Sequence, residues 1–191
     1  MVRILLELTL VAWLAVEVVL VLGRTLLDRI RGRGRVEDAG SAFLLFVALF
    51  LGFLLASRLA RLGVGRLPGS QDLHLWVGLL VMCAGLVLRV WAILELGGFF
   101  RGVVTIQEDH RLVSSGPYRY VRHPSYTGFL LALVGLAIAL GHWTSLLALL
   151  AAGLAGIAYR IHVEERALVG ALGNDYRRYQ RRTKRLLPLL Y

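Results

Sequence analysis

Residues 126–161 read YTGFLLALVGLAIALGHWTSLLALLAAGLAGIAYRI and hold two apolar runs with only Gly141 and His142 between them. A helix that crosses a bilayer needs about 20 mostly apolar residues. Two residues leave room for a tight turn and nothing longer, so we expect the runs to form an antiparallel helical hairpin. The stretch therefore predicts an all-α protein embedded in a membrane.

Three more apolar runs precede the hairpin, and together they predict five transmembrane helices. The five runs are Ile4–Leu22, Ala42–Ala56, Leu73–Leu94, Tyr126–Leu140 and Trp143–Ile161. The composition agrees, because 58% of the residues are hydrophobic, 18% are charged and the mean hydropathy is +0.69. Soluble domains average roughly 45–50% apolar and about 25% charged residues. The composition therefore excludes a disordered chain, a disulfide scaffold and an ordinary soluble enzyme.

The net charge of +10 is distributed as in a membrane protein rather than as in a nucleic-acid-binding one. The first and third connections and the C-terminal tail carry 16 Arg and Lys residues, against three in the second and fourth connections. The side with more positive charge is cytoplasmic. We therefore predict an N-terminus outside, a C-terminus in the cytoplasm, contacts with membrane lipids and no nucleic-acid partner.

Two polar regions are long enough to hold chemistry, and both fall on the predicted cytoplasmic side. The first is the connection Glu95–Ser125, in which Val103–Ile106 and Arg111–Ser114 are expected to pair as a short hairpin. The second is Arg160–Tyr191, in which one helix is expected to end at Gly173 and an amphipathic helix to follow.

One candidate cluster lies just before the fourth predicted helix and reads GPYRYVRHPSY from Gly116 to Tyr126. Pro124 suits the first turn of a helix. A helix start also has unpaired N–H groups that favour an anionic ligand group. The alternative is a basic, aromatic-rich loop that anchors the chain among lipid headgroups.

A second cluster contains Arg160, Glu164 and Glu165. Arg160 and Glu164 are four residues apart and share a helix face. They form either a simple ion pair or a site in which Glu164 binds a cationic group and Arg160 binds an anion.

A third group, Glu7, Glu17 and Arg89, lies inside predicted spans. Charged residues in such positions are costly unless they are paired or face the bundle interior. We expect them to pair with one another or to line that interior, and a proton or ion path is the alternative.

Several common chemistries have no support in the sequence. There is no Ser-His-Asp order with a nucleophile elbow and no HExxH motif. The five His residues are scattered and Cys83 is the only cysteine, so we predict neither a metal site nor an internal disulfide.

The first two clusters, in this order and spacing, resemble the isoprenylcysteine carboxyl methyltransferase family, which is itself similar to membrane phospholipid N-methyltransferases and thiol S-methyltransferases. The resemblance extends over residues 96–188. The matching pieces are Leu112-Val113 with Gly116-Pro117-Tyr118, Arg122-His123-Pro124-Ser125-Tyr126 with Gly128, Glu164-Glu165 with Leu168, Gly173 with Tyr176 and Tyr179, and Leu187-Pro188.

The resemblance implies S-adenosyl-L-methionine as the methyl donor, bound in a cytosolic pocket formed by the connection between helices 3 and 4 and the C-terminal helices. Residues 1–94 then supply three N-terminal helices, and residues 95–191 the catalytic half, of a single membrane domain 1–191. The implied cofactor-binding residues are His110, Leu112, Val113, Tyr118, His123, Pro124, Ser125, Tyr126 and Glu164. The implied catalytic residues, which resemble ligands of a substrate carboxylate, are Arg122 and Arg160.

The chemistry of these residue types agrees with methyl transfer. An in-line displacement requires alignment and exclusion of water but no metal. Glu164 suits the ammonium group of the donor, and an arginine suits an acceptor carboxylate. We expect O-methylation of a lipophilic small molecule or lipid-modified substrate that enters from the bilayer. The alternatives are methylation of a phospholipid amine or a thiol, and a non-enzymatic membrane scaffold or transporter subunit.

Overall fold

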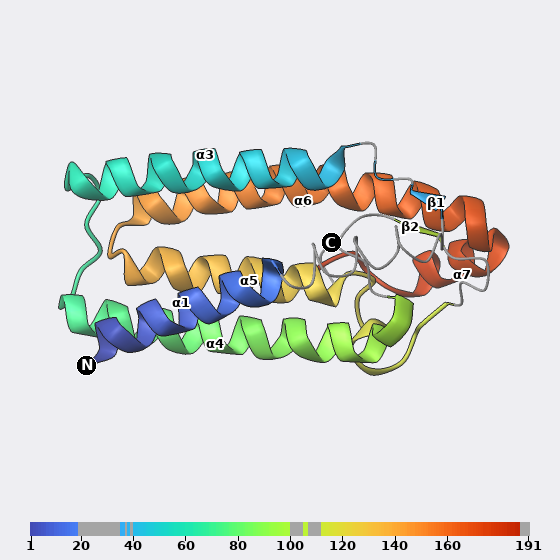
Figure 1. The fold of residues 1–191 in the computed structure, drawn as a ribbon, viewed down its shortest axis with the longest axis horizontal. Coiled ribbons are helices and arrows are strands. Elements are labelled where there is room, and N and C mark those ends of the chain that lie inside the picture. Colours follow the sequence, from blue (N-terminus) through green and yellow to red (C-terminus); the bar gives the residue numbers. More distant parts are fainter. Residues whose placement is uncertain (19–34, 37, 39, 100–104, 107–111, 188–191) are drawn as a thin grey trace.

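The computed structural model describes residues 1–18, 35–36, 38, 40–99, 105–106 and 112–187, and its main helices run lengthwise in an elongated bundle (Figure 1). The helices are α1 (Val2–Val18), α3 (Ser41–Arg61), α4 (Gln71–Leu96), α5 (Pro124–Ala139), α6 (Trp143–Leu172) and α7 (Asn174–Arg182), with the 3-10 turns η2 (Gly97–Phe99) and η3 (Gly116–Arg119). Two short strands, β1 (Arg35–Val36) and β2 (Thr105–Ile106), pair near the end of the bundle that carries α7. The predicted all-helical architecture is confirmed.

Three of these helices, α3, α4 and α6, are long and apolar enough to cross a membrane, with 21, 26 and 30 residues. The helices α1 and α5 are also apolar but have 17 and 16 residues. At 1.5 Å per residue each is about 25 Å long, which is less than a hydrocarbon core of about 30 Å. The count of five spans therefore stays a prediction, and three spans are supported by length.

The predicted helical hairpin is confirmed. Between α5 and α6, Gly141 has a φ of 73°, a left-handed conformation that glycine adopts readily because it has no Cβ. The N–H of Leu67 donates to the carbonyl of Gly141 at 2.9 Å, and the N–H of Trp143 donates to that of Gly65 at 2.8 Å. These bonds join the α5–α6 turn to the α3–α4 connection at the end of the bundle opposite α7 (Figure 1).

Close backbone contact defines the pairing of the helices, with α4 along α5 and α3 along α6, each pair antiparallel (Figure 1). A Cβ added to Gly85 of α4 would lie 2.6 Å from the carbonyl oxygen of Gly128 of α5, and one added to Gly78 would lie 2.6 Å from that of Gly135. Small residues are the usual means of close helix packing in membranes. The contacts run along much of both helices, and Gly128, near the start of α5, also lies against the backbone of Arg89 in α4.

Apolar side chains also cover the outside of the bundle. On α3, Phe43, Phe46 and Phe50 are exposed by 69%, 66% and 53%. Large contiguous apolar surfaces are uncommon on soluble monomers and mark contact with lipid or another apolar partner. The exposed face of α3 is the face that a membrane helix turns toward lipid.

The short hairpin expected within the third connection is wrong for the residues that the structure describes, while Val103, Val104 and Arg111 lie outside them. Residues Thr105–Ile106 pair instead with Arg35–Val36, antiparallel, with Arg35 opposite Ile106. Residues 112–114 form no strand. Alternating apolar residues indicate a strand but do not identify its partner, and the partner here comes from the connection between α1 and α3.

Gly85→Ala is expected to lower the free energy of unfolding by about 2 kcal/mol, because the new methyl group would overlap the α5 backbone at Ala132 N (2.5 Å) and Gly128 O (2.6 Å). Denaturant unfolding in detergent, followed by circular dichroism, measures this. Gly170→Ala is the control, because no atom lies within 4 Å of its added Cβ, and it is expected to stabilise by up to about 1 kcal/mol. Equal stabilities would contradict the close contact of α4 with α5.

Candidate functional site

Charged and aromatic side chains gather where α5 begins and α6 runs on into α7. Figure 1 shows these segments at one end of the bundle. His123 takes the N-cap position of α5, and Pro124, which has no N–H group, is the first helical residue. On the opposite side, α6 continues past the apolar run that ends at Ile161 as far as Leu172, and Gly173 is its C-cap, which confirms the predicted helix end. This extension brings acidic side chains to the start of α5.

Arg160, Tyr126 and Glu164 form a hydrogen-bonded chain. Nε of Arg160 donates to the Tyr126 hydroxyl at 2.8 Å, and that hydroxyl donates to Oε2 of Glu164 at 2.9 Å. Nη1 of Arg160 also donates to Oδ1 of Asp38 at 3.0 Å and to Oγ of Ser41 at 3.2 Å. The guanidinium is therefore enclosed by α6, α5 and the start of α3, and Arg160 is only 4% exposed.

His123 lies between the two adjacent carboxylates of α6. Its Nδ1 is 3.8 Å from Oε2 of Glu164, and its Nε2 is 3.4 Å from Oε1 of Glu165. The imidazole also stacks on the Tyr126 ring, with 5.6 Å between the ring centroids. The N-cap residue of α5 is thereby held by α6 on both edges of its ring.

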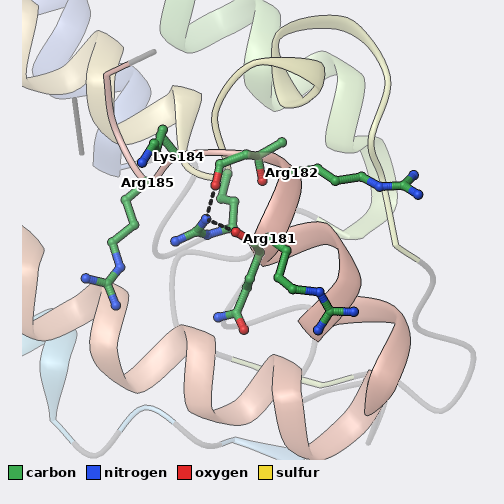
Figure 2. Close-up of a pocket in the computed structure, with 7 residues that line it drawn as sticks. Arg181, Arg182, Lys184 and Arg185 are labelled. Carbon is green, nitrogen blue, oxygen red and sulfur yellow. Dashed lines mark hydrogen bonds between the residues drawn. The ribbon is translucent and has the colours of Figure 1, made fainter. Parts of the chain in front are cut away.

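Glu165 holds two arginines. Its Oε1 accepts a hydrogen bond from Nε of Arg122 at 2.7 Å, and its Oε2 accepts one from Nε of Arg185 at 3.2 Å. Nη1 of Arg122 also donates to the carbonyl oxygens of Gln180 (3.1 Å) and Thr183, drawn as dashed lines in Figure 2. A cation is favourable at the C-terminal end of a helix. Arg122 therefore joins the carboxylate of α6 to the last turn of α7.

The chain after α7 runs beside the residues that precede α5. The N–H of Arg122 donates to the carbonyl of Lys184 at 2.7 Å, and the N–H of His123 donates to that of Arg185 at 3.0 Å. Leu186 then enters the core beside α6. The C-terminal segment consequently holds the backbone of both Arg122 and His123.

Two buried tyrosines fasten η3 between α4 and α7. The Tyr179 hydroxyl donates to the carbonyl of Tyr118 at 2.6 Å, and the Tyr118 hydroxyl donates to that of Ala92 at 3.3 Å. Burial raises the pKa of Tyr179 to about 12, although the charge of Arg122 opposes the shift. Burial, together with Glu164, also raises the pKa of Tyr118 well above its usual value. Both phenols are therefore neutral donors at physiological pH.

Arg89 of α4 connects the first helix to the start of α5. Its Nε and Nη2 pair with Oε1 and Oε2 of Glu17 at 2.5 and 2.6 Å. Its Nη1 donates to the carbonyl oxygen and the hydroxyl of Ser125 at 3.1 and 2.9 Å. The expected pairing of Glu17 with Arg89 is confirmed, whereas Glu7, expected in the same interior, is exposed.

The start of α5 offers fewer donors to a ligand than the sequence suggests. The N–H groups of Tyr126 and Thr127 both donate to the carbonyl of His123, at 3.0 and 3.1 Å. Pro124 has no N–H group. At most the N–H of Ser125 remains in this turn, so an anionic ligand group would depend mainly on side chains.

The predicted cofactor residues fall into three groups. Six of them surround the start of α5: Tyr118, His123, Pro124, Ser125, Tyr126 and Glu164. Leu112 and Val113 are half-buried ahead of η3. His110 lies outside the described residues. The assignment of these residues to a cofactor stays a prediction.

The two predicted catalytic arginines lie at the same end of the bundle but in different surroundings. Arg160 faces Tyr126 and Asp38, whereas Arg122 is tied to Glu165 and the end of α7. Sequence reasoning missed the role of Asp38, which follows Glu37 in a polar connection. The sequence did contain one indication, because Arg160 lies in an apolar helix and a charge in such a place needs an acidic partner.

A basic recess of about 300 Å³ lies beside the end of α7. It is lined by Arg122, Gln180, Arg181, Arg182, Thr183, Lys184 and Arg185. In Figure 2 the charged ends of Arg181, Arg182, Lys184 and Arg185 point in different directions. The recess is a basic surface and not a preformed site for one anion.

The fold and the site define a helical membrane protein with a charged, hydrogen-bonded cluster at one end of its bundle. The family model for the isoprenylcysteine carboxyl methyltransferase (ICMT) family matches residues 76–170, which include most of α4, all of α5 and nearly all of α6. The chain belongs to this family and is an integral membrane protein.

Known relatives agree with this placement. The protein-S-isoprenylcysteine O-methyltransferase of Schizosaccharomyces pombe is 35% identical over 111 residues, which cover 57% of this chain and 47% of the relative. Enzyme B of the same name from Arabidopsis thaliana is 34% identical over 128 residues, 64% of each chain. A solved structure of the eukaryotic intramembrane Ras methyltransferase ICMT superposes with a TM-score of 0.56 and 28% identity, covering 76% of this chain and 52% of that one. The chain thus spans less than two thirds of the length of each of these relatives.

Glu165→Ala is expected to lower the free energy of unfolding by about 3 kcal/mol, because it leaves the largely buried guanidinium of Arg122 without its carboxylate. Denaturant unfolding in detergent measures the change. Arg166→Ala, at the next and exposed position of α6, is the control and is expected to change stability by less than about 0.5 kcal/mol. Equal stabilities would show that Glu165 does not hold Arg122 in place.

Proposed function

We propose that this protein is an S-adenosyl-L-methionine-dependent methyltransferase that methylates the carboxylate of a lipophilic acceptor in the membrane, such as isoprenylcysteine or a related lipid. Membership of the ICMT family and the names of the relatives support the reaction class. Among the residues, the series of hydrogen bonds from Glu164 through the Tyr126 hydroxyl to Arg160 supports the proposal. It puts a carboxylate suited to a cation beside a guanidinium suited to an anion.

The residues at the site fit the proposed cofactor. The amino-acid end of S-adenosyl-L-methionine carries an ammonium group, which calls for an accessible carboxylate. The Glu164 side chain is 28% exposed, against 7% for Glu165. Glu165 is already held by two arginines, whereas Glu164 accepts a hydrogen bond from the neutral Tyr126 hydroxyl. Glu164 therefore has the exposure and the charge that an ammonium ligand needs.

The rest of the proposed cofactor pocket follows the start of α5. When bound, the cofactor supplies an electrophilic methyl group for an in-line displacement. The stacked rings of His123 and Tyr126 offer an aromatic wall there, and Tyr118 lies buried beside α4. The proposed lining is His110, Leu112, Val113, Tyr118, His123, Pro124, Ser125, Tyr126 and Glu164. The side chains of this lining orient the cofactor and exclude water from the reacting atoms.

Arg160 is the proposed ligand of the acceptor carboxylate. Asp38 and Tyr126 fix the orientation of its guanidinium, and a fixed orientation is a condition for specific binding of a carboxylate. Asp38 also offsets part of the positive charge, so Arg160 orients the acceptor without strongly weakening it as a nucleophile. Arg122 is committed to Glu165 and α7, so its proposed part in catalysis is to position the residues around it.

The proposed arrangement brings together reactants from two phases. The cofactor enters from the cytoplasm, on the side of the C-terminus, and the acceptor enters sideways from the bilayer. The N-terminus then lies outside, as the distribution of positive charge predicts. Residues 1–191 form one membrane domain, with residues 95–191 as its catalytic half.

Purified protein in lipid vesicles, given methyl-labelled S-adenosyl-L-methionine and a farnesylated cysteine acceptor, is expected to transfer the label in a form that mild base releases. A methyl ester hydrolyses under these conditions, whereas a methylamine or a thioether does not. Base-stable label in the lipid fraction would indicate an amine or thiol acceptor instead. Folded protein that binds no S-adenosyl-L-methionine in calorimetry would overturn the proposal.

Glu164→Gln is expected to weaken S-adenosyl-L-methionine binding by about tenfold or more, because it removes the charge opposite the ammonium and keeps the shape. The double variant Arg160→Gln/Asp38→Asn is expected to lower turnover by at least about tenfold with cofactor affinity nearly unchanged. Replacing both partners avoids a buried, unpaired carboxylate at Asp38.

Calorimetry and labelled turnover measure the two effects separately. His162→Ala, at an exposed position of α6 between the two targets, is the control and is expected to behave as the wild type. If Glu164→Gln binds the cofactor normally and the double variant turns over normally, the assignment of the site is contradicted.

A further inference from the structure

We infer that Glu17, in the first helix, is a positioning residue for the cofactor-binding start of α5 and acts through Arg89. The link from α5 to the cofactor rests on the proposed function. The contacts that join Glu17 to α5 do not depend on it, since they are features of the fold.

The ion pair between Glu17 of α1 and Arg89 of α4, called the clamp below, is bidentate and largely buried, unlike a chance surface contact. Two nitrogens of Arg89 meet the two oxygens of Glu17 at 2.5 and 2.6 Å. The two side chains are only 10% and 18% exposed. A bidentate guanidinium–carboxylate pair fixes both distance and orientation.

Aromatic side chains enclose this pair and tie it to α5. The indole N–H of Trp13 donates to Oε1 of Glu17 at 2.9 Å. The Trp13 ring meets Phe129 of α5 edge-on, with 5.3 Å between centroids, and the guanidinium of Arg89 lies 5.1 Å from the centre of the same Phe129 ring. The clamp therefore touches α5 through packing as well as through hydrogen bonds.

The third nitrogen of Arg89 reaches the backbone of the candidate cofactor pocket. Nη1 donates to both the carbonyl oxygen and the hydroxyl of Ser125, in the first turn of α5. Ser125 stands between His123 and Tyr126, whose side chains both approach Glu164. The position of Arg89 consequently influences the first turn of α5, which orients the rings of His123 and Tyr126.

Glu17 determines whether Arg89 can stay in that position. A guanidinium among apolar helices is costly when it has no counter-ion. Without the Glu17 carboxylate, the guanidinium of Arg89 would move toward water at the end of the bundle, and its hydrogen bonds to Ser125 would weaken. The first turn of α5 would then become less rigid, and the side chains of His123 and Tyr126 would lose their fixed positions.

The helix that provides Glu17 lies outside residues 76–170, where the family model matches. Arg89 and Ser125 lie inside the match. The N-terminal helix thus completes an interaction whose other members belong to the family's shared segment.

The test compares wild type, Glu17→Gln and the control Glu7→Gln, which changes an exposed carboxylate of the same helix. Each protein is placed in lipid nanodiscs for amide hydrogen exchange, for calorimetry with S-adenosyl-L-methionine and for the labelled turnover assay. Glu17→Gln is expected to speed exchange at residues 125–129, to weaken cofactor binding about tenfold and to change kcat at saturating cofactor by less than about twofold. Glu7→Gln is expected to match the wild type.

Two outcomes would overturn the inference: unchanged exchange at residues 125–129 in folded Glu17→Gln, or faster exchange spread evenly over all helices, which indicates a general loss of stability. If Glu17→Gln does not fold, the double variant Glu17→Gln/Arg89→Gln, which has no unpaired charge, decides by the same exchange measurement. If the wild type does not bind the cofactor, the proposed function is overturned. The hydrogen-exchange comparison alone then tests whether Glu17 positions the first turn of α5.

Discussion

Charged groups at the end of an apolar helix bundle have to be neutralised within it, and this constraint shapes the whole polar end of the protein. Each of three arginines finds its carboxylate on another element: Arg89 with Glu17, Arg122 with Glu165 and Arg160 with Asp38. Leaving any of these charges unpaired in such surroundings would be strongly unfavourable. The pairs therefore join α1 to α4, the start of α5 to α6, and the start of α3 to α6.

The same constraint gives two neighbouring carboxylates different roles in the protein. Glu164 and Glu165 are adjacent on α6, and both approach His123. Glu165 is the more buried and holds two arginines, which fastens the C-terminal segment to the start of α5. Glu164 keeps contact with solvent and faces Tyr126. Surroundings rather than residue type separate the structural carboxylate from the one suited to a ligand.

Helix packing places this cluster at one end of the apolar bundle. Glycines bring α4 and α5 into backbone contact, and the exposed apolar faces of the helices suit lipid. Beyond that region, α6 carries the polar residues into α7 and the C-terminal segment. The proposed reaction requires such a place, because its polar cofactor would come from water and its apolar acceptor from the bilayer.

The sequence by itself determined the helices, the tight turn at Gly141, the shared face of Arg160 and Glu164, and the family. These features depend on local periodicity, on residue spacing and on motifs that lie close together in the chain. The tertiary structure alone decided that β2 pairs with β1, that Asp38 reaches Arg160 and that Arg122 is bound to α7. Each of these partners is distant in sequence, and with 21 arginines and 12 acidic residues in the chain, only the packing of helices determines which charges meet.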